Sequence, residues 1–140
     1  MEIAEFKVRC YVCWKRFSIP ALSDFSYGEF LFINNKTREF RYFNRIENQE
    51  VENIIMAKLD SDSTLAQKND DTKGNTYLRL AGKLSDGEFE PIFSNVKCPR
   101  CKFGFHSFPN NKIGITNIAE LTFEESKKRT ITENIKELKL

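Results

Sequence analysis

The chain has 140 residues, of which 40% are hydrophobic and 30% charged, and its 13 phenylalanines alone exclude wholesale disorder. The formal net charge of +2 is too small to require a polyanionic partner, and no apolar run exceeds about four residues, so no stretch can span a bilayer. The chain begins Met-Glu-Ile-Ala-Glu, with acids where a signal peptide carries bases, and we expect a cytoplasmic, single zinc-binding domain over residues 1–140.

The first elements are predicted to be strands. Residues 2–10 alternate weakly between apolar and polar and lead into a cysteine pair, and residues 14–19 form a return strand. Residues 27–33 and 37–43 are rich in aromatic and β-branched side chains and flank the turn sequence Asn34-Asn35-Lys36. This pattern predicts a hairpin.

A central helix is predicted after the hairpin. Asn44 can cap it, and Val51, Ile54, Ile55 and Leu59 follow at the spacing of one helical face. This helix is expected to cover the hairpin sheet.

The second half of the chain is less regular. Residues 60–76 contain few apolar side chains and predict an exposed loop, and residues 77–84 fit a strand or a short helix. Strands are expected at 89–96 and 113–115, and a capping box at Thr122 opens a C-terminal helix that reaches about Leu138. The predicted fold class is α+β, a mainly antiparallel sheet with a central and a C-terminal helix and a cysteine-knuckle pair at one end.

The cysteines form two matching pairs. Cys10 and Cys13 are separated by two residues, and so are Cys98 and Cys101. In a reducing compartment such pairs are ligands more often than disulfides, because two thiolates on a tight turn converge on one ion. The two pairs together offer a complete tetrahedral shell. We expect the four cysteines to bind one metal ion, although 84 residues (14–97) separate the pairs.

The residues around each pair resemble the knuckles of zinc ribbons, a broad structural class. Val96-Lys97-Cys98-Pro99-Arg100-Cys101-Lys102-Phe103-Gly104 is similar to the strand, C-P-x-C turn and return strand of a ribbon, and residues 8–17 are a looser match. The insertion between the two knuckles is longer than ribbons usually have. The resemblance implies a structural zinc ion held by four sulfur atoms.

Zn²⁺ is the expected ion, one per chain, because four thiolates suit it. Iron in a rubredoxin-like site is the alternative metal. Two other interpretations need no metal: four buried structural thiols, or a redox dithiol made by Cys98 and Cys101 alone. The presence of a second cysteine pair argues against the dithiol.

No catalytic motif accompanies the cysteines. A catalytic zinc keeps one position open for water, whereas four thiolates close the shell. The only histidine, His106, can be a fifth ligand, a hydrogen-bond partner of the site or an ordinary strand residue, and we expect the last. The zinc-deaminase pattern also fails, because Lys97 and not proline precedes Cys98. A non-enzymatic protein is therefore expected.

Cations surround both cysteine pairs. Residues 7–17 and 97–106 hold seven Lys and Arg side chains and no acid, so the rest of the chain has a net charge of −5. Some of this positive charge can balance the formal −2 of a zinc ion with four thiolates. Aromatic residues lie among these cations: Tyr11, Trp14, Phe17, Phe103, Phe105 and Phe108. Such a mixture is typical of single-strand nucleic-acid binding, but it also fits packing around the knuckles.

Two functions are compatible with these features. The near-neutral charge, small size and lack of catalytic motifs favour a protein-interaction module with a structural zinc ion, for example an immunity or antitoxin-like protein with an unidentified protein partner. The alternative is a nucleic-acid-binding protein that uses the basic, aromatic knuckle surface. An exposed Trp14 in a contiguous basic face favours nucleic acid, and buried aromatics favour a protein partner.

Overall fold

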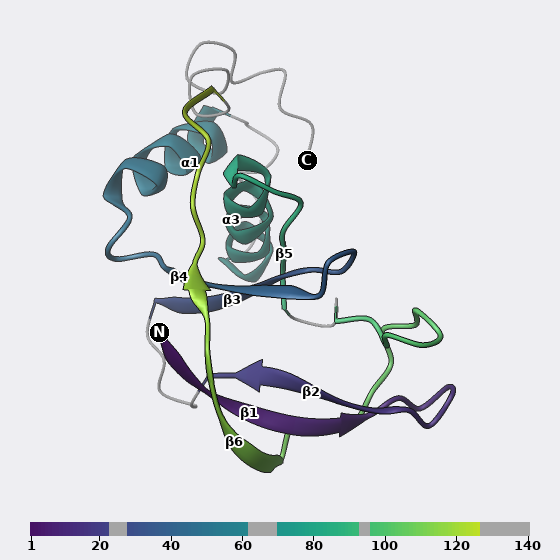
Figure 1. The fold of residues 1–140 in the computed structure, drawn as a ribbon. Coiled ribbons are helices and arrows are strands. Elements are labelled where there is room, and N and C mark those ends of the chain that lie inside the picture. The colour runs from purple at the N-terminus through teal and green to yellow at the C-terminus, as the bar shows by residue number, and fades with distance from the viewer. Residues whose placement is uncertain (23–27, 62–69, 93–95, 127–140) are drawn as a thin grey trace.

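Three layers stack in the structure, a computed structural model that describes residues 1–22, 28–61, 70–92 and 96–126 (Figure 1). A three-stranded sheet in the order β2-β1-β6 is one outer layer, and a sheet in the order β5-β3-β4-β7 lies in the middle. Within these residues, helices α1 (Gln49–Ser61) and α3 (Asp70–Leu84) cover the other face of the middle sheet. The fold is α+β with mainly antiparallel sheets, which confirms the predicted class.

The outer sheet joins the two ends of the described chain. Its strands are β1 (Glu2–Arg9), β2 (Arg16–Ala21) and β6 (Asn111–Asn117), all antiparallel. The predicted strands on both sides of the first cysteine pair are thus confirmed as β1 and β2. Because β6 pairs with β1, the segment after the second cysteine pair returns to the strand that leads into the first.

The middle sheet is centred on the predicted hairpin. Strands β3 (Glu29–Asn34) and β4 (Glu39–Asn44) pair in register, with the short strands β5 (Glu90–Pro91) and β7 (Ala119–Glu120) at the edges. Among the described strand pairs, only β4 and β7 are parallel. The strand predicted over 89–96 is shorter than expected and stops at Pro91.

Strand β3 is buried on both faces because it lies in the middle layer. Leu31 and Ile33 pack toward the outer sheet, whereas Phe32 packs among the helices with Phe43 and Val51. Alternate residues of a strand point to opposite faces, so one strand supplies two cores. Phe30 packs on the same helical side as Phe32.

The predicted loop over residues 60–76 is wrong where it can be compared with the structure. Helix α1 extends to Ser61, and helix α3 begins at Asp70. The polar composition of this segment favoured a loop. However, the C-terminal half of α3 carries an apolar stripe that is buried against the middle sheet: Tyr77, Leu80, Ala81 and Leu84. Tertiary packing of such a stripe stabilises helical turns that composition alone disfavours.

The other elements can be compared only in part. Residues 62–69, and the predicted C-terminal helix beyond Ser126, lie outside the described residues. The short strand predicted at 113–115 is confirmed as the centre of β6. None of the described helices is long and apolar enough to cross a membrane.

Two glycines of helix α3 test how closely this helix packs. A Cβ atom at Gly82 would lie 2.3 Å from the Phe89 carbonyl oxygen, whereas a Cβ atom at Gly74 would meet nothing within 4 Å. We expect Gly82→Ala to lower the free energy of unfolding by about 1–3 kcal/mol through overpacking. Gly74→Ala should raise it by about 0.5–1 kcal/mol, because alanine favours the helix. Urea denaturation of both variants checks this, and equal effects at the two positions would contradict the close approach of α3 to Phe89.

Candidate metal centre

The first cysteine pair lies in the turn between β1 and β2. The Cys10 N–H donates to the Lys15 carbonyl at 2.9 Å, and the Trp14 N–H donates to the Cys10 carbonyl at 3.0 Å. The Val12 N–H points at the Cys10 Sγ atom at 3.4 Å. Trp14 has a φ of 67°, in the left-handed region, and this reverses the chain toward β2.

The second cysteine pair lies in a turn with the same set of hydrogen bonds as the first. The Cys98 N–H donates to the Phe103 carbonyl at 2.8 Å, and the Lys102 N–H donates to the Cys98 carbonyl at 3.0 Å. The Arg100 N–H points at the Cys98 Sγ atom at 3.4 Å, and Lys102 has the same φ of 67° as its counterpart Trp14. Two turns with one geometry therefore come from segments with little sequence in common outside the cysteines.

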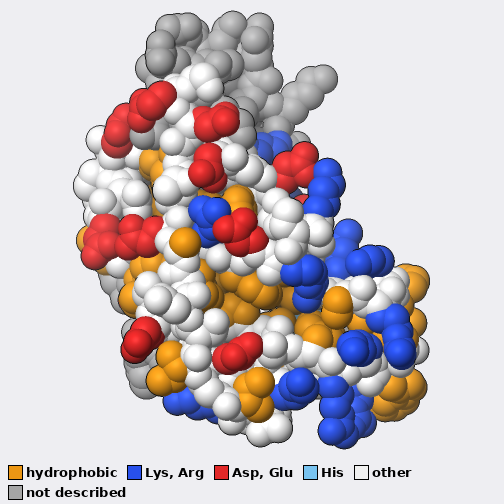
Figure 2. Space-filling model, in the orientation of Figure 1, with side chains coloured by type: hydrophobic (Ala, Val, Ile, Leu, Met, Phe, Trp, Pro, Cys, Tyr) orange, Lys and Arg blue, Asp and Glu red, His pale blue; other side chains and the backbone are white. Residues whose placement is uncertain are grey.

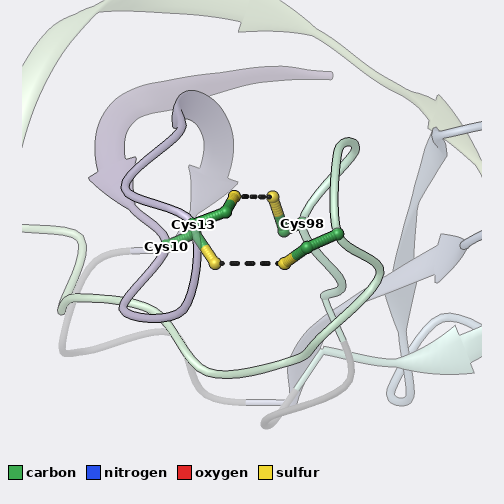
Figure 3. A group of neighbouring side chains, drawn as sticks. Cys10, Cys13 and Cys98 are labelled. Carbon is green, nitrogen blue, oxygen red and sulfur yellow. Dashed lines mark hydrogen bonds between the residues drawn. The ribbon is translucent and has the colours of Figure 1, made fainter.

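The four sulfur atoms meet between the two turns (Figure 3). The Sγ atoms of Cys10 and Cys101 are 3.4 Å apart, those of Cys13 and Cys98 are 3.5 Å apart, and all four lie within 4.8 Å of one another. A tetrahedral ion with metal–sulfur bonds of about 2.3 Å places its sulfur atoms about 3.8 Å apart. The cluster matches that size, is too open for disulfides of about 2.05 Å, and is consistent with a zinc-ribbon-like site that can coordinate a metal ion.

Backbone hydrogen bonds also join the two turns. The Tyr11 N–H donates to the Phe105 carbonyl at 3.0 Å, and the Ser107 N–H donates to the Arg9 carbonyl at 2.9 Å. The Ser107 hydroxyl accepts a hydrogen bond from the Arg9 N–H at 2.9 Å. The segment that follows the second cysteine pair therefore lies along the first turn.

The β3–β4 hairpin turn holds the second cysteine turn from the other side. The Asn35 Oδ1 atom accepts a hydrogen bond from the Lys97 N–H at 3.1 Å, and the Arg38 guanidinium donates to the Lys97 carbonyl. Arg38 also lies over the Phe17 ring, with 5.7 Å from its Cζ atom to the ring centroid. Sequence reasoning missed this role of Asn35 and Arg38, because no local pattern relates a hairpin turn to a cysteine turn some sixty residues later.

The pKa values of Cys98 and Cys101 are shifted in opposite directions. Burial raises the pKa of Cys98, but hydrogen bonds from the Cys101 and Arg100 backbone N–H groups and from neighbouring thiols outweigh it and lower this pKa to about 6. The backbone N–H of Phe103 lowers the pKa of Cys101, but burial and the other three thiols raise it to about 12. The first thiolate is therefore stabilised by its neighbours and the last is opposed by them, so full ionisation of the cluster calls for a cation.

His106 lies outside the sulfur cluster. Among the described residues, the group at metal-binding distance contains the four cysteines alone. The His106 ring packs edge-on against Phe17 with 5.7 Å between centroids, and its Nδ1 atom is 2.9 Å from the Ser107 carbonyl oxygen. These contacts favour a packing role for His106.

No protein-family model, no curated protein and no solved structure matches this chain. The interpretation of the site therefore depends on its own geometry.

Removal of one sulfur tests whether the cluster is a metal clasp. Structural zinc sites contribute on the order of 10 kcal/mol to folding, comparable with the stability of a whole domain. We expect Cys98→Ser to lower the melting temperature by more than about 10 °C, since each kcal/mol shifts it by a few degrees. Chelator should lower the melting temperature of the unmodified chain similarly and change that of Cys98→Ser little, as calorimetry can show.

His106→Ala is the control, and its melting temperature should stay responsive to chelator. Four buried thiols without a metal would give the opposite pattern, in which Cys98→Ser destabilises the chain but chelator has no effect on the unmodified protein.

Proposed function

We propose that the chain binds single-stranded nucleic acid through the surface around its two cysteine turns, and that one structural Zn²⁺ ion holds these turns together. The observation that carries the proposal is the exposure of aromatic side chains among cations that form no salt bridge within the described residues. We define the knuckle surface as residues 7–16 and 97–108.

Zinc is supported by the donor set. Four sulfur atoms at tetrahedral spacing are a typical structural zinc site, and they leave no open position for water. The ion would be bound by Cys10, Cys13, Cys98 and Cys101, and its chemistry would be to hold the two turns in place. Iron accepts the same four ligands, so the ion must be identified by direct measurement.

The aromatic residues of the knuckle surface point outward. Trp14 is 65% exposed, Phe105 66% and Phe108 86%, and Tyr11 and Phe103 are also exposed. Phe17, which lies just outside this surface in the sequence, is buried under the cysteine turns. A cluster of exposed rings is typical of an interaction site, and every nucleobase offers a flat face for stacking.

The charge of the knuckle surface also supports the proposal. In the part of the chain that the structure describes, no carboxylate forms a salt bridge with any of the seven Lys and Arg side chains of residues 7–17 and 97–106. Two positive charges would balance the formal −2 of the metal centre, and five would remain. Figure 2 shows Lys and Arg interleaved with hydrophobic side chains at the knuckle end, while acids gather over the helical half.

A single strand fits this surface better than a duplex. Stacking requires bases whose faces are free, and a paired helix offers only base edges and phosphates. Arg9 lies over the Trp14 ring at 5.6 Å, and Tyr11 and Phe105 form a tilted pair at 5.3 Å. These contacts help to fix the positions of the Trp14, Tyr11 and Phe105 rings on the surface.

A protein partner is the second candidate, and a different observation favours it. Ile113 and Ile115 are 52% and 63% exposed on β6, an edge strand among the described strands of its sheet. An extended peptide can pair with such an edge. This candidate predicts that substitutions on β6, and not on the knuckle surface, abolish binding.

Elemental analysis tests the identity of the ion. Protein purified without added metal should contain one zinc atom per chain, and Cys10→Ser protein should contain much less. Stoichiometric iron with a visible colour would overturn the zinc assignment, and a metal-free folded protein would overturn the metal centre.

Trp14 allows a direct test of nucleic-acid binding, because it is the only tryptophan in the chain. We expect oligothymidylate to quench Trp14 fluorescence at low salt and to do so more than duplex DNA of equal charge. Trp14→Leu should weaken binding about fivefold or more, because stacking on an aromatic ring is worth about 1–3 kcal/mol per base. Anisotropy of a labelled oligonucleotide gives this affinity.

Ile115→Ala is the matched control, since Ile115 is as exposed as Trp14 but lies on β6. Its affinity for the oligonucleotide should equal that of the unmodified chain. Absence of quenching at low salt, where ionic contacts are strongest, would defeat the nucleic-acid proposal.

A further inference from the structure

A second basic feature borders the knuckle surface. A groove of about 690 Å³ runs between the C-terminal half of α3, strand β5 and the β3–β4 turn. Its walls carry Lys36, Arg79, Lys83 and Lys97, against the two acids Glu88 and Glu90. We call this feature the basic groove, and its lining has an excess of two positive charges.

Lys97 belongs to both the basic groove and the knuckle surface. Its backbone is held by Asn35 and Arg38 of the β3–β4 turn, and the next residue is Cys98. The turn that forms one wall of the groove is thus fastened directly to the second cysteine turn. Figure 2 shows Lys and Arg side chains continuing from the knuckle end along one edge of the molecule toward the helices.

The groove cations can exchange their present contacts for a ligand. Lys36 forms a salt bridge with Glu88 at 2.7 Å, but the two side chains are 79% and 73% exposed. Exposed ion pairs of this kind contribute little to stability, so a phosphate can replace the carboxylate easily. Arg79 is exposed on α3 and forms no salt bridge within the described residues, and its guanidinium can bind a phosphate through two parallel hydrogen bonds.

We propose that the basic groove binds the sugar–phosphate backbone of the same single strand whose bases stack on the knuckle surface. This inference rests on the proposed function. The groove contributes charge and no exposed aromatic ring, so it lengthens the binding site without adding sequence preference. The ligand class is therefore a single strand long enough to reach from Trp14 past Lys97 to Arg79.

A length series on the intact protein tests the groove. Oligothymidylates of about 4 and about 12 nucleotides span the usual site sizes of single-strand-binding domains. The double variant Lys36→Gln/Arg79→Gln should bind the long oligonucleotide about tenfold more weakly at ~0.1 M salt and reduce its salt slope by about 1.4, or ~0.7 per lost phosphate contact. The affinity of the double variant for the short oligonucleotide should not change. The quenching of its Trp14 fluorescence at saturating oligonucleotide should not change either.

Two further variants sharpen the test. Glu88→Gln removes the carboxylate that competes for Lys36 and should tighten binding of the long oligonucleotide. Lys112→Gln removes an exposed cation on β6, outside the groove, and should leave the affinity within about twofold. All side chains changed here are exposed, so circular dichroism and zinc content should match the unmodified protein.

The outcomes separate the groove from the proposed function. Suppose that the long oligonucleotide quenches Trp14 fluorescence of the unmodified chain and that the double variant binds it equally well with the same salt slope. The groove proposal is then wrong, and the proposed binding at the knuckle surface is unaffected. A loss that is equal for short and long oligonucleotides, or equal in Lys112→Gln, would reduce the effect to general charge and also overturn the groove. No quenching by the unmodified chain would overturn the proposed function itself.

Discussion

The meeting of four sulfur atoms between two distant turns is the constraint on which the rest of the structure depends. Cys10 and Cys13 lie in the turn between β1 and β2, whereas Cys98 and Cys101 follow strands β3, β4 and β5 and both described helices. A bound ion would join residues that are far apart in the sequence, and its binding free energy would therefore add to the free energy of folding. The site therefore joins the outer sheet to the middle sheet as well as joining two cysteine pairs.

The same arrangement explains the charge distribution around the site. Two turns that direct their backbone N–H groups at the sulfur atoms stabilise the first thiolate, but crowding opposes the last, which raises the pKa of Cys101 to about 12. A bound divalent ion would resolve that conflict and would leave a small residual negative charge. The seven surrounding cations exceed this charge by five, and that excess is one basis of the proposed nucleic-acid contact.

The β3–β4 turn connects the site to the remainder of the surface. Asn35 and Arg38 form hydrogen bonds with the backbone of Lys97, immediately before the second cysteine turn. Lys36, which also belongs to the β3–β4 turn, lines the basic groove. One short turn thus fixes the position of the knuckle surface relative to the groove. If a single strand binds as proposed, this fixed placement would lower the entropy that is lost on binding.

The sequence by itself determined the local features: the two C-x-x-C turns, strands β1 and β2, the β3–β4 hairpin and the apolar face of α1, because each depends on spacing within a few residues. Only the tertiary structure decided that Asp70 begins a helix, since burial of Tyr77 and Leu84 overrides the polar composition before them. It also decided that Phe17 is buried while Trp14 is exposed, because two aromatics three residues apart differ only in what packs over them. The roles of Asn35 and Arg38 lie in contacts across some sixty residues, and contacts at that range leave no periodic signal in a single sequence.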